Sequence, residues 1–162
     1  MTPDEFKALP EQAQRDRVVA IARTWLGTPY HTAGTIKRVG CDCATMPAMT
    51  YLEAGIIQSF DPAQYPPDWH LHRSEERYMA GVLEHAHEIG GPPKEGDFAL
   101  WKFGRCFSHG AIVVKWPTII HAYLGKTVQL ENVDQTKWLR FIGENTSDKG
   151  KPRPVKFFSP WG

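Results

Sequence analysis

The apolar residues of this chain change their spacing near Gly90, from a helical pattern to an extended one. Before Gly90, apolar side chains recur at intervals of three and four residues, and after Gly96 they alternate or form short runs between turn residues. Helices followed by strands are typical of an α+β domain with an antiparallel sheet. We therefore expect N-terminal helices packed on a central antiparallel β-sheet.

Length and charge narrow the classes of protein to consider. A chain of 162 residues fits a single domain, which we expect to span residues 1–162. A net charge of +1 gives no electrostatic basis for binding nucleic acid or an anionic membrane. No apolar run reaches the roughly 18 residues that a membrane span needs. The N-terminus lacks the regions of a secretory signal, so we expect synthesis in the cytoplasm without export by that route.

Start and stop signals predict four helices and five strands. A capping box runs from Thr2 to Glu5, and a second helix is expected from Pro10 to Gly27. Its buried stripe comprises Val18, Ile21, Ala22 and Trp25, with Arg15 mostly off the stripe. A third helix ends at Gly55, and a fourth, with a buried face at Met79, Val82, Leu83 and Ala86, is expected between Ser74 and His87. Strands are expected near residues 97–103, 109–114, 118–123, 127–131 and 153–158.

Cys43 is the candidate nucleophile. It lies at the start of the third predicted helix, where unpaired backbone N–H groups and the helix dipole favour a thiolate. We therefore expect the pKa of its thiol to lie well below the free value of roughly 8.5. The other cysteines are Cys41 and Cys106, and this odd, small number predicts free thiols in a reducing compartment. Cys41 and Cys43 are too close for the usual zinc spacing, so we expect no metal and no cofactor.

Two histidines are candidates for the base that a thiol requires. Alternation along the strands places His109 and His121 on the same face of the sheet. A turn centred near Lys115 would set the two residues opposite one another, with Cβ atoms about 4.5–5.5 Å apart. One imidazole could then hold the ring and the tautomer of the other. This is the nucleophile, base and orienting residue of cysteine hydrolases.

Five stretches occur in the order found in one family of enzymes. They are residues 22–30, 40–43, 96–98, 108–113 and 120–122. In these stretches the chain resembles the NlpC-type cysteine peptidases, which are papain-like endopeptidases that cut peptidoglycan stem peptides. The resemblance implies cleavage of a stem peptide at the bond from D-glutamate to diaminopimelate.

The resemblance also assigns roles to particular residues. It makes Cys43 the nucleophile, His109 the general base and His121 the residue that orients the base. Tyr30 corresponds to a tyrosine at the active site of the family. Its hydroxyl and the backbone N–H of Cys43 would hold the oxyanion.

Three further residues are expected beside the substrate. Asp42 corresponds to the residue before the nucleophile, which also has a structural role, and Ser108 precedes the predicted base. Trp69 lies in the proline-rich stretch 60–72, which we interpret as an ordered loop that is either a groove wall or docking surface, or simply anchored by its aromatic residues. Ala44-Thr45 replaces the small Ser-Gly pair usual in the family, which would narrow the groove.

Residues 65–72 resemble a loop of peptidases encoded with phage tails or gene transfer agents. Such enzymes are assembled in the cytoplasm and delivered on the particle. The resemblance implies a virion or tail location, action at the bacterial cell wall, and tail-tip or baseplate proteins as partners. Two alternatives remain open: a mainly structural tail-tip assembly protein, and an acyltransferase or amidase that uses the same catalytic set.

Overall fold

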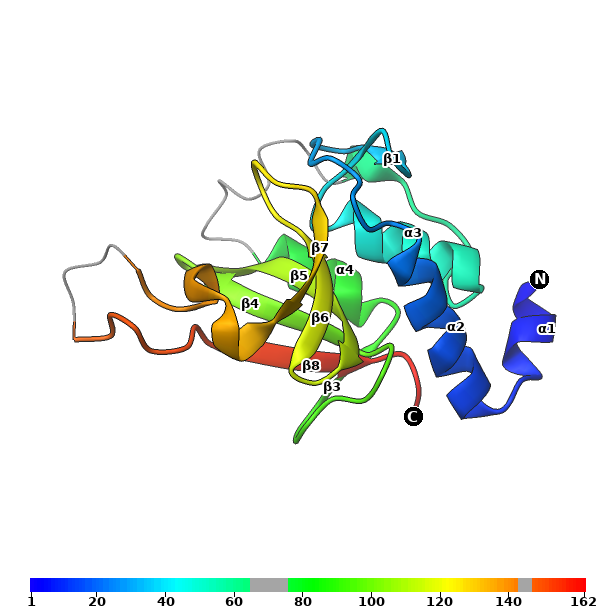
Figure 1. Cartoon of the computed structure of the whole chain (residues 1–162). Coiled ribbons are helices and arrows are strands. Elements are labelled where there is room, and N and C mark those ends of the chain that lie inside the picture. Colours follow the sequence, from blue (N-terminus) through cyan, green and yellow to red (C-terminus); the bar gives the residue numbers. More distant parts are fainter. Residues whose placement is uncertain (65–75, 143–146) are drawn as a thin grey trace.

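A six-stranded antiparallel sheet lies at the centre of the structure, with the strand order β3-β8-β4-β5-β6-β7 (Figure 1). The computed structural model describes residues 1–64, 76–142 and 147–162. The strands of this sheet are β3 (His87–Ile89), β4 (Phe98–Phe103), β5 (Cys106–Lys115), β6 (Thr118–Ala122), β7 (Val128–Asn132) and β8 (Val155–Ser159). A separate pair of strands is formed by β1 (Thr35–Ile36) and β2 (Gly40–Cys41). All five predicted strands are present, whereas β1, β2 and β3 were not predicted from the sequence.

The helices precede most of the sheet in the chain, which confirms the predicted α+β class. They are α1 (Pro3–Lys7), α2 (Glu11–Arg23), α3 (Thr45–Ala54) and α4 (Arg77–Leu83), with short 3₁₀ turns η1 (Pro62–Gln64), η3 (Val133–Gln135) and η4 (Lys137–Leu139). Thr2 and Glu5 form the predicted capping box of α1. Gly55 ends α3 in the left-handed region with a φ of 100°. None of the helices in the described part of the chain combines the length and hydrophobicity needed to span a bilayer.

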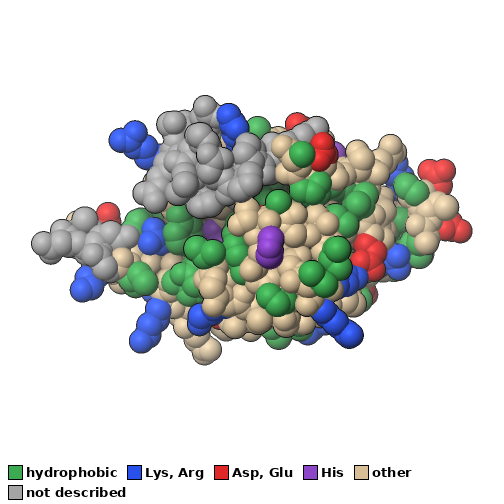
Figure 2. Space-filling view, turned by 90° about the horizontal axis from the view of Figure 1, so that it is seen from above, with side chains coloured by type: hydrophobic (Ala, Val, Ile, Leu, Met, Phe, Trp, Pro, Cys, Tyr) green, Lys and Arg blue, Asp and Glu red, His purple; other side chains and the backbone are tan. Residues whose placement is uncertain are grey.

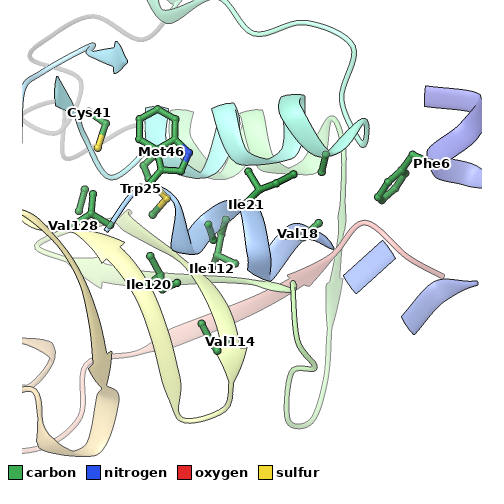
Figure 3. Packing of buried hydrophobic residues seen from close by; sticks show 13 residues of the cluster. Phe6, Val18, Ile21, Trp25, Cys41, Met46, Ile112, Val114, Ile120 and Val128 are labelled. Atoms are coloured by element: carbon green, nitrogen blue, oxygen red, sulfur yellow. The ribbon is translucent and has the colours of Figure 1, made fainter. Parts of the chain in front are cut away.

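Helices α2 and α3 cover one face of the sheet (Figure 1). The predicted stripe of α2 is buried there, against side chains that point from β5, β6 and β7 toward the helices (Figure 3). The principal contacts involve Val18, Ile21, Ala22, Trp25, Met46, Ile112, Ile120 and Val128. Burial of this apolar surface is the main force that holds the helices on the sheet.

The opposite face of the sheet is also covered, by residues 133–139 of η3 and η4. Leu139 of η4 is buried among residues of β4, β5 and β6, namely Ala99, Trp101, Ala111, Val113 and Ile119. Strands buried on both faces carry nearly continuous apolar runs, as residues 98–101 do. The sheet is therefore the middle of three layers.

Arg15 is a correction to the predicted helix stripe. We expected it mostly off the buried face, but it is only 4% exposed. Its guanidinium donates to the Asp97 carboxylate at 2.9 Å and to the backbone carbonyl of Glu95 at 2.8 Å. The pair connects α2 to the start of β4. A buried arginine is tolerated here because its charge is paired.

The fourth helix is shorter than predicted. Leu83, expected on the buried face, is 52% exposed, whereas Tyr78 is buried against Phe98. His87, expected at the end of the helix, instead begins β3 and pairs with β8. The predicted cap Ser74 lies outside the described residues, as do Trp69 and most of the proline-rich stretch.

Candidate active site

Cys43 lies in the turn between β2 and α3, immediately before the N-cap residue Ala44. It is 6% exposed, and its Sγ is 3.6 Å from the backbone carbonyl oxygen of Ser108, to which the thiol donates. The backbone carbonyl of Cys43 accepts a hydrogen bond from the hydroxyl of Tyr78. The turn is thus held between β5 and α4. As predicted, Cys41, Cys43 and Cys106 form no disulfide with one another.

Asp42 stabilises this turn by accepting hydrogen bonds from three backbone N–H groups. One carboxylate oxygen accepts from the backbone N–H groups of Ala44 and Thr45, at 2.9 and 2.8 Å, and the other accepts from that of Ala33 at 2.7 Å. Asp42 is 3% exposed. The carboxylate therefore takes the place at the N-terminus of α3 that favours negative charge. This position fits the structural role expected for Asp42 better than contact with substrate.

The expected low pKa of Cys43 is wrong. Burial, followed by the negative charge of Asp42, raises the pKa of the Cys43 thiol, although the backbone N–H of Gly110 opposes the shift. A thiolate in this turn would lose its hydration and lie beside a carboxylate that already uses the helix terminus. The uncharged thiol is consequently the resting form, and a base must remove its proton.

His109 and His121 are in contact, although the strand register differs from the predicted one. The turn between β5 and β6 lies at Trp116-Pro117, and a bulge follows Val113, so Ile112 pairs with Ile120. This register offsets the two histidines diagonally by two residues. Diagonal neighbours on one face are within reach of long side chains. The Nε2 atom of His109 lies 3.0 Å from Nδ1 of His121.

Glu131 of β7 extends this chain of side chains, and our reading of the sequence did not identify it. Its carboxylate lies 2.6 Å from Nε2 of His121. The hydrogen bond from His121 lowers the pKa of Glu131, although burial opposes the shift. His121 pairs with Gln129 in the β6–β7 register, and Glu131 lies two residues further along the same face. Had the pairing of β6 with β7 been predicted, alternation would have placed Glu131 on the same face as His121.

Aromatic side chains enclose the two histidines. The indole of Trp138 is stacked on His121, with ring centroids 4.9 Å apart and an interplanar angle of 7°, and it meets His109 edge to face at 4.8 Å. Tyr123 is stacked on the same indole. His109 and His121 are 8% and 1% exposed. Burial and then the charge of His121 hold the pKa of His109 well below its ordinary value, so His109 is a neutral base at pH 7.

Tyr30 lies near enough to Cys43 and Asp42 for negative charge on them to affect the pKa of its hydroxyl. It forms an isolated parallel bridge with Cys41. Burial raises the pKa of the Tyr30 hydroxyl, and negative charge at Cys43 or Asp42 raises it further. The phenol therefore remains protonated and can donate a hydrogen bond, as an oxyanion donor must.

The thiol and the imidazoles approach β5 from different faces. Cys43 packs with Leu100 and Tyr78 on the helix side, whereas His109 contacts Trp101 and Trp138 on the other side. Within the described residues, no hydrogen bond joins Cys43 to either imidazole. The thiol instead donates to Ser108, the residue before His109. Catalytic hydrogen bonds are often incomplete until substrate binds.

A small apolar cavity of about 80 Å³ lies beside the nucleophile. Ala44 lines it together with Pro47 of α3 and with Tyr78 and Val82 of α4. Ala44, which replaces the serine usual in the family, therefore faces an apolar space.

Among the described residues, no group of three or more His, Cys, Asp or Glu side chains has the arrangement of a metal site. Figure 2 shows basic side chains spread around one face rather than gathered in a patch.

Comparison with known proteins matches residues 27–145 to the NlpC/P60 family. No curated protein matches the chain. Among solved structures, the NlpC/p60 domain of the peptidoglycan hydrolase SagA has a TM-score of 0.53 at 20% identity, with 88% of this chain and 96% of that chain covered. NlpC2 from Trichomonas vaginalis has a TM-score of 0.60 at 16% identity, with 94% of this chain and 48% of that chain covered.

Another similar structure is described as non-catalytic. RipD from Mycobacterium tuberculosis, a non-catalytic NlpC/p60 domain protein adapted to peptidoglycan binding, has a TM-score of 0.52 at 15% identity, with 90% of this chain and 96% of that chain covered. At these identities the similarities establish the fold alone. Catalysis must therefore be argued from the residues of this chain.

Proposed function

Because the chain belongs to the NlpC/P60 family, whose members are normally cysteine peptidases or peptidoglycan hydrolases, we propose that it hydrolyses peptidoglycan stem peptides. The observation that carries this proposal is the 3.0 Å contact between His109 and His121 beside the turn that holds Cys43. A nucleophile, a neutral base and an orienting residue are thereby supplied by adjoining elements. The domain that performs this function spans residues 1–162.

In the proposed reaction, His109 removes the thiol proton of Cys43. The thiolate attacks the carbonyl carbon of the scissile bond, while the Tyr30 hydroxyl and the backbone N–H of Cys43 stabilise the oxyanion. His109 then gives its proton to the leaving amine, which departs and leaves a thioester on Cys43. Water, deprotonated by the same imidazole, hydrolyses the thioester and restores the thiol.

The hydrogen bond from the Cys43 thiol to the Ser108 carbonyl must break before the reaction can begin. The thiol proton points to the Ser108 carbonyl, so it must turn toward His109 before attack. His109 directly follows Ser108 in β5 but lies on the other face of the strand, so substrate binding must also bring the imidazole and the thiol together. A substrate that occupies the groove and excludes water would strengthen the transfer of the proton.

The proposed scissile bond joins D-glutamate to diaminopimelate. Digestion of defined muropeptides, with the products weighed by mass spectrometry, identifies the bond that is cut. We expect Cys43→Ala to abolish cleavage while circular dichroism shows an intact fold. Hydrolysis by this variant at the rate of the unchanged chain would rule out the mechanism. The same product masses distinguish peptide hydrolysis from acyl transfer or from amidase activity.

The example of RipD makes binding without cleavage the second candidate. This chain has a cysteine immediately before a helix, two contacting histidines and a protonated tyrosine, which are the residue types that the proposed reaction requires, and this favours the enzyme. Binding to purified cell walls that leaves muropeptides uncut would favour the second candidate instead.

We also propose that the protein acts at the bacterial cell wall from a phage-like tail, with tail-tip or baseplate proteins as partners. The support is the resemblance of residues 65–72, a segment outside the described residues. Co-purification with a tail complex tests this proposal. Activity of the purified chain alone, without stable incorporation into a complex, would argue against a mainly structural role in the tail tip.

A further inference from the structure

Glu131 lies at the far end of a chain of three side chains from three neighbouring strands. Its carboxylate is 2.6 Å from Nε2 of His121, whose Nδ1 is 3.0 Å from Nε2 of His109. The side chain of Glu131 is 23% exposed, whereas that of His121 is 1% exposed. A carboxylate at the edge of the site therefore reaches a fully buried imidazole.

The hydrogen-bonding capacity of each group determines where the protons lie. Glu131 is ionised at neutral pH because its hydrogen bond with His121 lowers its pKa, and an ionised carboxylate can only accept. When the His121 ring carries a single proton, that proton must then lie on Nε2, which leaves Nδ1 as the acceptor. His109 consequently donates from Nε2. The Nδ1 atom of His109 is left with a free lone pair, which is what a general base needs.

The surroundings support this arrangement. Trp138 is stacked on His121, and its indole further lowers the pKa of the Glu131 carboxyl. The positive charge of Lys126 acts on Glu131 in the same direction. Trp138 also contacts His109 of β5 edge to face. These groups hold the carboxylate ionised and keep the two rings from turning.

We infer that Glu131 is a positioning residue, which acts through His121 to hold His109 in the tautomer that accepts the thiol proton. The inference rests on the proposed function, since it assigns Glu131 a part in that reaction. The carboxylate also stabilises the positive charge that forms when His109 takes the proton from Cys43. A carboxylate that merely satisfied the buried His121 would have neither effect on His109.

Two variants separate these effects. Glu131→Gln keeps an oxygen that accepts from His121 but removes the negative charge, whereas Glu131→Met removes both. The matched control is Asp134→Asn, which removes a negative charge from an exposed side chain three residues along the chain. All are made in the full chain, and their folding is checked by circular dichroism.

The first readout is nitrogen NMR of the histidine rings, which needs no substrate. In the unchanged chain and in Asp134→Asn, we expect Nδ1 of His109 to be unprotonated and Nε2 to be protonated. Glu131→Gln should keep this order, whereas Glu131→Met should give a mixture of both tautomers at His109. An unaltered His109 ring in folded Glu131→Met would overturn the inference, whatever the activity.

The second readout is muropeptide cleavage. We expect kcat to fall about tenfold in Glu131→Gln and about 100-fold in Glu131→Met, with KM within about twofold and Asp134→Asn unchanged. A kcat within twofold of the unchanged chain in both variants would overturn the inference. If the unchanged chain cuts nothing, the proposed function fails, and the ring nitrogens still decide whether Glu131 sets the tautomer.

Discussion

The turn that holds Cys43 and the strands that hold His109 and His121 are stabilised in different ways. The internal shape of the turn depends on local contacts, since Asp42 binds backbone N–H groups no more than nine residues away, although Ser108 and Tyr78 anchor the turn to β5 and α4. The histidines depend on side chains from three strands and on Trp138 of η4. The shape of the turn that carries the nucleophile is thus mainly a property of a short segment, whereas the state of the base is a property of the sheet.

Because of this difference, we expect substitutions in the two regions to have different effects. A change at Asp42 should alter stability and the acidity of the thiol together, because this carboxylate contributes to both. A change near the histidines should alter proton transfer and leave the nucleophile in place.

Removal of the base should have the largest effect. We expect His109→Ala to lower kcat/KM by about 10³-fold, because general-base catalysis and activation of the nucleophile are both lost. The control is His87→Ala, which removes an exposed histidine from β3 at the sheet edge remote from β7. Muropeptide cleavage measures both. Equal loss in the two variants would show that the effect is not specific to the base.

Loss of the Tyr30 hydroxyl should have an intermediate effect. We expect Tyr30→Phe to lower kcat about 10- to 100-fold with little change in KM, because the hydroxyl is needed when negative charge develops on the oxyanion. Tyr51→Phe is the control, since the Tyr51 hydroxyl donates to the backbone carbonyl of Gly96 at 2.8 Å. That variant should lose about 1 kcal/mol of stability and keep its kcat. A normal kcat in Tyr30→Phe would remove Tyr30 from the oxyanion site.

Asp42→Ala should separate stability from acidity within the turn. Loss of the cap on α3 should lower the free energy of unfolding by about 1–3 kcal/mol, measured by urea denaturation. The same change removes a negative charge that raises the pKa of Cys43, so this pKa should fall. Alkylation of Cys43 should therefore rise at a lower pH in Asp42→Ala than in the unchanged chain. An unchanged alkylation profile would mean that burial alone raises the pKa.

The smallest expected effect is a dependence of stability on pH. Because the pKa of His109 in the folded protein lies well below 6.5, the unfolded chain binds a proton first as the pH falls through about 6.5. The stability due to the neutral ring is complete above that pH and declines below it until the folded ring is protonated. Between pH 7.5 and 5.5 we expect a loss of about 1 kcal/mol, measured by urea denaturation. The same slope in His109→Gln would contradict this assignment.

Local patterns in the sequence were sufficient for much of the fold. The capping box at Thr2, the buried stripe that includes Val18 and the end of α3 at Gly55 depend on neighbours within a few residues. The contact between His109 and His121 was also predicted, even though the register was wrong. Alternation alone placed both histidines on one face, where a shift of two residues preserves the side of the sheet.

Contacts between distant segments could not be predicted in the same way. The ion pair of Arg15 with Asp97 joins two elements, and the sequence pattern of neither element indicates contact with the other. Glu131 required the pairing of β7 with β6. The pKa of Cys43 required its burial beneath Tyr78, and burial outweighs the helix terminus that the sequence reveals. Electrostatics at the site therefore depends on packing.

The central claim is that the sulfur of Cys43 is the attacking atom. Its most direct test is to treat the protein with a thiol-alkylating reagent, locate the modified cysteine by peptide mass mapping, and measure the remaining muropeptide cleavage in each sample. We predict that activity falls in proportion to the alkylated fraction of Cys43 and reaches zero when that fraction is complete, with Cys41 and Cys106 unmodified. Full alkylation of Cys43 with cleavage retained would contradict the account.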